Sequence, residues 1–159
     1  MMEYKTKVHA EDGRQDLTIT REFNLPVELL FRAYTKPEII AQWMDNKVVK
    51  HESRKHGSYR FEKSDAEGNI LFSANGVIHD FIPNSKIIRT FEMENAPFDV
   101  QIEYIDFKEL TNDTSALTIH TVFRSAELRD MQLKMPFAFG INMAHNMLEK
   151  IALKFKQSI

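Results

Sequence analysis

Apolar residues recur near the end of the chain in alternating steps of three and four, the spacing of one face of an α-helix. The positions that follow this step are Phe137, Ile141, Ala144, Leu148, Ile151 and Phe155. Met143 and Met147 widen the stripe, whereas most other positions are polar, among them Asn142 and His145. The pattern predicts a long helix within residues 125–155 that lies with its apolar flank against a larger partner.

Two residues inside this stretch modify the expected helix. Pro136 lacks a backbone N–H and clashes with the preceding turn, so we expect a break just before it, into a short and a long piece. Gly140 costs about 1 kcal/mol relative to alanine in a helix interior. A close approach of the sheet or of a ligand would explain this glycine, and so would simple tolerance of it.

Upstream of this helix, short segments alternate between apolar and polar residues, which is typical of β-strands. They cover residues 6–10, 17–23, 47–54, 58–63, 69–81, 86–94, 99–109 and 115–124. Short breaks rich in turn residues separate the last six segments, so these segments should form an antiparallel meander. The pattern does not decide which residues of segment 69–81 face inward.

Two short helices are expected between the second and third of these segments. Pro26 suits the first helical position, and residues 27–34 follow with helical spacing. Thr35 and Glu38 have the spacing of a capping box at the start of a second helix over residues 37–42, which ends at Trp43.

The N-terminus, residues 1–16, is interpreted as an extension. Segment 6–10, the turn at residues 11–14 and segment 17–23 predict a hairpin arm, with a loose end as the alternative. The remaining strands form a sheet long enough to curl around the C-terminal helix. We therefore predict an α+β fold in which one domain spans residues 1–159. A chain of this length can bury a hydrophobic core without the help of disulfides.

Composition narrows the expected partners and the expected compartment. The chain has 43% hydrophobic and 28% charged residues and a net charge of −2, which gives no global attraction to nucleic acid or to anionic lipid. No apolar run approaches the ~20 residues of a membrane span, and the first residues do not form a signal peptide. Cysteine is absent, which excludes disulfides and thiolate chemistry. We expect a cytoplasmic protein that binds neither nucleic acid nor membranes.

Several short motifs resemble a known family. They are residues 17–23 (LTITREF), 26–31 (PVELLF), 35–38 (TKPE) with Trp43, 57–61 (GSYRF), 76–80 (GVIHD) and 125–130 (SAELRD). Together with the order of elements, they resemble the helix-grip fold of START-like proteins and birch-pollen allergens. The sequences of these motifs are most similar to the branch named after the activator of the ninety-kilodalton heat-shock protein ATPase.

The resemblance implies a cavity between the sheet and the C-terminal helix that binds a small hydrophobic molecule without catalysis, in a protein with a role in stress. Methionine and aromatic side chains suit such a cavity, although any one of them can equally be plain core. The candidate lining residues are Trp43, Tyr59, Phe61, Phe91, Met93, Tyr104, Phe123, Met131, Met135, Phe139 and Met143.

Polar candidates are few. The six histidines show no common metal-ligand spacing, so we expect neither a metal nor a cofactor. His120 is the best candidate for a polar group inside the cavity, with a surface position as the alternative. Glu92, Glu94 and Glu103 lie on neighbouring strands, and the alternation of the first two with Phe91 and Met93 indicates that these carboxylates point to solvent.

Two other functions use the same resemblance. A polyketide cyclase or dehydratase would need an inward polar set, for which His120 with Tyr104 or Asn75 is the candidate. The chain has neither a Gly-x-Ser-x-Gly elbow nor a glycine-rich phosphate loop, so no motif supports catalysis. The third function is a cofactor that stimulates a heat-shock chaperone ATPase.

A homodimer is also possible from the sequence. An open edge strand or an exposed flank of the short helices would favour such pairing.

Overall fold

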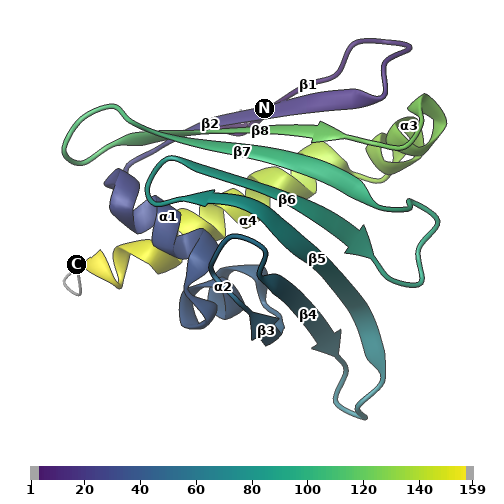
Figure 1. Ribbon diagram of the computed structural model, residues 1–159, viewed down its shortest axis with the longest axis horizontal. Coiled ribbons are helices and arrows are strands. Elements are labelled where there is room, and N and C mark those ends of the chain that lie inside the picture. The colour runs from purple at the N-terminus through teal and green to yellow at the C-terminus, as the bar shows by residue number, and fades with distance from the viewer. Residues whose placement is uncertain (1–3, 157–159) are drawn as a thin grey trace.

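A curved antiparallel sheet wraps around the long C-terminal helix (Figure 1). The computed structural model describes residues 4–156, and in this range the chain forms eight strands and four helices. The first three residues of the expected N-terminal extension, and residues 157–159 of the expected domain, lie outside the described residues. This α+β arrangement is the predicted helix-grip fold.

All neighbouring strands of the sheet are antiparallel, in the order β1-β2-β8-β7-β6-β5-β4-β3. The strands are β1 (Lys7–His9), β2 (Asp16–Phe23), β3 (Lys47–His51), β4 (Ser58–Ser64), β5 (Ile70–Ile82), β6 (Lys86–Met93), β7 (Gln101–Glu109) and β8 (Ser115–Val122). Strands β3 to β8 form the predicted meander. The pairing of β1 with β2 confirms the hairpin arm.

The helices are α1 (Val27–Thr35), α2 (Pro37–Met44), α3 (Ala126–Lys134) and α4 (Phe137–Leu153). The expected break before Pro136 is confirmed, because α3 ends at Lys134 and α4 begins after the proline. The predicted capping box is wrong. Thr35 is instead the last residue of α1, and its hydroxyl donates to the carbonyl oxygen of Phe31 at 3.0 Å. Lys36 occupies the cap position of α2 and makes no side-chain capping bond.

Helix α4 crosses the concave face of the sheet, and α1 and α2 lie beside its C-terminal half (Figure 1). The predicted apolar stripe packs on the core, with Leu148 and Ile151 buried and the other four members partly buried. The expected polar side is wrong at two positions, because Asn142 and His145 are fully enclosed. Met143 and Met147 are exposed instead of widening the stripe.

The N-terminal arm explains why these polar side chains of α4 are buried. The Nδ1 atom of His145 lies 2.9 Å from the hydroxyl of Thr6, next to β1, and the backbone N–H of Thr6 donates to Asn142 at 3.1 Å. Arg21 of β2 donates to the same hydroxyl at 3.2 Å and to Asn146 at 2.7 Å. Buried polar groups are tolerated when they are hydrogen-bonded, so the arm supplies the hydrogen-bonding partners that this flank of α4 needs.

This enclosure predicts a pH-dependent stability. Burial, with a smaller contribution from the charge of Arg21, lowers the pKa of His145 to about 3. The unfolded chain has the ordinary histidine pKa of about 6.5 and therefore binds a proton that the folded chain excludes. The free energy of unfolding should fall as the pH decreases from about 6.5 toward 4, by up to about 1.4 kcal/mol per pH unit for this residue. Burial likewise lowers the pKa of His51, to about 4, so it adds to the slope.

Urea unfolding at a series of pH values measures this slope. His145→Asn should remove the part of the slope that comes from one bound proton. This holds whether or not the substitution changes the stability at neutral pH. His79→Asn, which replaces an exposed histidine of β5, is the matched control for the substitution itself. A wild-type slope in the His145→Asn variant would contradict the burial of an uncharged histidine.

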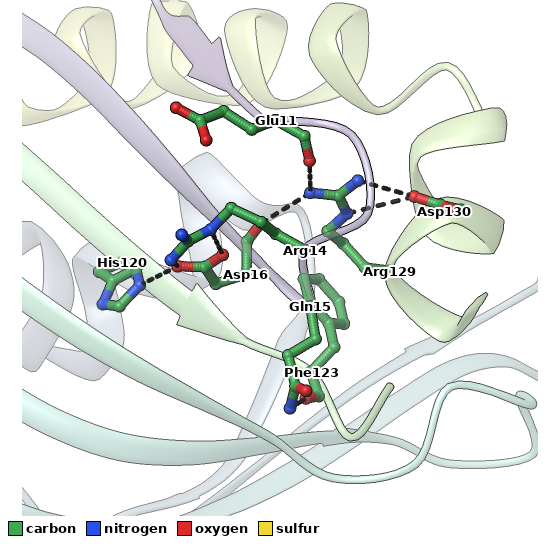
Figure 2. A network of polar contacts seen from close by, with 8 residues as sticks. All are labelled: Glu11, Arg14, Gln15, Asp16, His120, Phe123, Arg129 and Asp130. Carbon is green, nitrogen blue, oxygen red and sulfur yellow. Dashed lines mark hydrogen bonds and ion pairs between the residues drawn. The ribbon is translucent and has the colours of Figure 1, made fainter. Parts of the chain in front are cut away.

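The turn of the N-terminal arm is fastened to α3 by one arginine (Figure 2). The Nη1 atom of Arg129, whose residue is only 2% exposed, donates to the carbonyl oxygens of Glu11 at 2.7 Å and Asp16 at 3.0 Å. Its Nη2 atom pairs with Asp130 at 2.9 Å. Ser125 caps the same helix at its N-terminus. These contacts hold α3 at the start of α4.

Arg129→Ala should lower the free energy of unfolding by about 2–4 kcal/mol, because it leaves two carbonyl oxygens without their charged donor. The matched control is Arg124→Ala, whose side chain is 75% exposed and pairs with Asp99 at the surface. This control should change stability by no more than about 0.5 kcal/mol. Equal losses in the two variants would show that the fastening does not stabilise the fold.

Candidate functional site

A cavity of about 560 Å³ lies between the concave face of the sheet and helices α2, α3 and α4. This volume is within the range of pockets that hold small organic molecules, roughly 300–1,000 Å³. Most of the wall is apolar. Its apolar and small residues are Ile19, Ile40, Trp43, Met44, Phe61, Phe72, Phe91, Met93, Ile119, Phe123, Met135, Pro136, Phe137, Gly140, Ile141 and Ala144.

Trp43 is held firmly in this wall. Its indole Nε1–H donates to the carbonyl oxygen of Ala33 at 2.6 Å, so the last residues of α2 are tied to α1. The ring is 8% exposed and packs against Tyr34 at a centroid distance of 5.4 Å. Since Trp43 is the only tryptophan of the chain, its emission reports on the cavity alone.

Polar side chains also reach the cavity, and three of them form a row across the sheet. Arg89 of β6 lies directly opposite Glu103 of β7, and Glu103 lies directly opposite Thr121 of β8. Residues paired in this way point to the same face. Gln101 lies two positions before Glu103 on the same strand face, while Tyr34 and Gln132 complete the polar lining.

Arg89 forms a buried ion pair at the cavity wall. Its Nε atom donates to a carboxylate oxygen of Glu103 at 2.8 Å. The guanidinium carbon also lies 5.0 Å from the ring centroid of Tyr59 and 5.9 Å from that of Tyr34. Burial acts to lower the pKa of Arg89, but Tyr59 and Glu103 outweigh it and hold that pKa above its ordinary value. The guanidinium therefore stays charged.

The aromatic ring beneath Arg89 depends on a glycine. The hydroxyl of Tyr59 donates to the backbone carbonyl oxygen of Thr90, across the strand that contains Gly76. A Cβ atom on Gly76 would lie 2.1 Å from that carbonyl oxygen and 2.5 Å from the tyrosine hydroxyl. Only glycine fits there, so Gly76 allows Tyr59 to support the arginine from behind.

Several polar atoms of the row, and those of the neighbouring Gln101 side chain, have no partner among the described residues. In residues 4–156 the Nη atoms of Arg89, the second carboxylate oxygen of Glu103 and the side chain of Gln101 make no hydrogen bond. Within this part of the chain, the side-chain atoms that are both sealed from solvent and unpaired belong to Arg21 and His51. The unpaired atoms of the row are therefore accessible from the cavity they line.

Comparison with known proteins gives the family. A family model described as "Activator of Hsp90 ATPase homolog 1-like protein" matches residues 24–152. The chain belongs to this family. Among curated proteins no sequence matches it.

Solved structures of several bacterial proteins share the fold of this family member. A protein from Rhodobacter sphaeroides superposes with a TM-score of 0.82 at 17% identity, covering 94% of this chain and 99% of that one. One from Arthrobacter aurescens gives 0.80 at 16% identity, with 93% and 91% covered. One from Mycobacterium smegmatis gives 0.76 at 22% identity, with 92% and 95% covered. At these identities the likeness shows the fold alone.

The structure brings together six of the residues that the sequence placed in the cavity of this family member. They are Trp43, Phe61, Phe91, Met93, Phe123 and Met135. They come from α2, β4, β6, the end of β8 and the α3–α4 junction. In β4 and β6 the inward face follows the period of two that the sequence shows.

The placement of Tyr104 and His120 in the cavity is wrong. Their rings stack on the outer face of the sheet, with centroids 5.8 Å apart, and His120 Nε2 lies 2.8 Å from a carboxylate oxygen of Asp16 (Figure 2). Successive strand residues alternate between faces, so the inward position of Glu103 and Thr121 directs their neighbours outward. Asn75 also faces outward, where it donates to Glu94 at 2.6 Å.

Four other candidates do not line the cavity. Tyr59 lies in the core behind Arg89. Met131, Phe139 and Met143 are 42%, 46% and 44% exposed, on the outer side of the helices. Apolar residues are frequent on protein surfaces, so apolar character alone did not locate these three.

Strand β5 shows why its inward residues were left undecided. Phe72, Gly76 and Ile78 face inward, but a bulge between Ile78 and Asp80 reverses the alternation, so that Phe81 also packs on the core. No close approach of the sheet explains Gly140, because a Cβ atom there would have no protein atom within 4 Å. Gly140 lines the cavity, so the approach of a ligand stays a prediction.

The ion pair was not predicted from the sequence, although the pattern contained a sign of it. Arg89 shares a strand face with Phe91 and Met93, which were predicted to point inward. Glu92 and Glu94 do not line the cavity, as expected, but Glu103 does. A charged residue at an inward-facing position of an otherwise apolar strand face was the available clue.

Among residues 4–156 no group of three or more acidic or histidine side chains could hold a metal ion. In the same part of the chain, every helix is too short or too polar to span a membrane.

Proposed function

We propose that this protein binds a small hydrophobic molecule in the cavity between the sheet and α4, and that it does so without catalysing a reaction. The observation that carries the proposal is the cavity itself, about 560 Å³ of mostly apolar space between the sheet and the helices. Protein interiors are normally packed as tightly as organic crystals, with few voids larger than a water molecule. A ligand would restore the contacts that this wall lacks.

The polar groups of the cavity support binding over catalysis. The inward set suggested for a cyclase or dehydratase, His120 with Tyr104 or Asn75, lies on the outer face. The groups that do line the cavity include an arginine and a glutamate bound to each other, which suits the orientation of a ligand. Stimulation of a heat-shock chaperone ATPase stays a prediction, and ATP turnover by the chaperone at saturating protein would test it.

The neutral fluorescent probe N-phenyl-1-naphthylamine tests the cavity directly, because it absorbs the light that Trp43 emits. Titration into the protein should quench Trp43 in a saturable, one-to-one manner. Ala144→Leu extends an apolar side chain into the cavity and should weaken binding at least about tenfold, or roughly 1.4 kcal/mol.

The matched control is Ala138→Leu, which adds the same atoms to the exposed side of the same helix. It should bind the probe like the wild type, and circular dichroism should show both variants folded. Quenching that survives Ala144→Leu unchanged would place the probe elsewhere. Absence of saturable quenching in the wild-type protein would contradict the proposed function.

A further inference from the structure

We propose that the cavity selects uncharged amphipathic molecules, with an apolar body and one group that both donates and accepts a hydrogen bond, such as a hydroxyl or a primary carboxamide. Arg89 and Glu103 would bind that group together. The inference rests on the proposed function and names the chemical class of its ligand.

Positive and negative charge are balanced along the wall of the cavity. Among the lining residues the charged side chains are Arg89 and Glu103, and each already faces the opposite charge at 2.8 Å. The polar residues beside them, Gln101, Thr121 and Gln132, are uncharged. A ligand carboxylate would gain Arg89 but meet Glu103, and a ligand amine would meet the reverse. Desolvating a charge without a free partner costs more than burying a neutral group that is hydrogen-bonded.

The ion pair leaves hydrogen-bonding atoms of both side chains free. The pair is joined through Nε of Arg89 and one oxygen of Glu103, so the arginine keeps Nη donors and the glutamate keeps an acceptor. Within residues 4–156 none of these atoms has another hydrogen bond, and they line the cavity. Because the two side chains are already in contact, one ligand group beside them can accept from the arginine and donate to the glutamate. A hydroxyl or a carboxamide has both capacities.

The ion pair is held at the wall of an otherwise apolar cavity. Two apolar side chains would complete the wall without the cost of desolvating two charges. The aromatic rings of Tyr59 and Tyr34 and the space left by Gly76 hold the guanidinium in place. A polar group fixed in this way at the wall of an apolar cavity serves to orient a ligand.

Displacement of N-phenyl-1-naphthylamine by four eight-carbon probes tests the class. The probes are 1-octanol, octanamide, octanoate and octylamine. In the wild type, the alcohol and the amide should displace the fluorescent probe at concentrations at least about tenfold lower than the two ions. Tighter binding of octanoate or octylamine than of 1-octanol would overturn the inference.

Two variants test whether the ion pair causes the preference. In Glu103→Gln the carboxylate no longer opposes an anion, so octanoate should gain at least about tenfold relative to 1-octanol. Arg89→Leu/Glu103→Leu removes both charges together and so leaves no unpaired charge. In this variant 1-octanol should lose at least about tenfold relative to 1-chlorooctane, which has no comparable hydrogen-bonding group.

The control is Arg60→Leu/Glu94→Leu, which removes an ion pair whose side chains do not line the cavity. Its probe ratios should equal those of the wild type. If Glu103→Gln and the double variant Arg89→Leu/Glu103→Leu both bind the naphthylamine normally and keep the probe ratios of the wild type, the inference is overturned and the proposed function stands. Absence of binding by the naphthylamine and by every eight-carbon probe would overturn both.

Discussion

The position of α4 across the concave face of the sheet is the constraint on which the rest of the structure depends. Its apolar flank, with Leu148 and Ile151, packs on the core, and a second flank is held by the hydrogen bonds of His145 and Asn142 to the N-terminal arm. Arg129 fastens the turn of that arm to α3. Because contacts of different kinds fix the helix, its first turns can pass over the sheet without filling the space below, which the cavity occupies.

The wall of this cavity combines two kinds of surface. Aromatic, aliphatic and methionine side chains give a flexible apolar lining that accommodates varied shapes. The row from Arg89 to Thr121 adds a rigid polar strip, fixed by the strand pairing and by the rings beneath the arginine. Binding and orientation are thus assigned to different residues. Membership of the family and the fold shared with solved structures establish the architecture, and the side chains of Arg89, Glu103 and Thr121 form the polar strip.

The elements could be predicted from sequence because each depends on local chemistry: helical spacing along α4, the break at Pro136, and alternation between turn residues along the meander. The site was only partly predictable. Phe61, Phe91 and Phe123 were found because apolar alternation marks an inward face. Tyr104 and His120 were misplaced because residue type was given more weight than strand parity. Asn142 and His145 were misplaced because their partners lie more than a hundred residues away in the chain.

The central claim is that the space between sheet and helix is a binding site, and native mass spectrometry of protein purified from its own host tests it most directly. The account predicts a species heavier than the polypeptide by the mass of a small organic molecule, which is uncharged, carries a hydroxyl or an amide, and is released on denaturation. Ala144→Leu protein from the same host should lose this species. A spectrum that shows only the polypeptide in both proteins, or a retained molecule in the variant, would contradict the account.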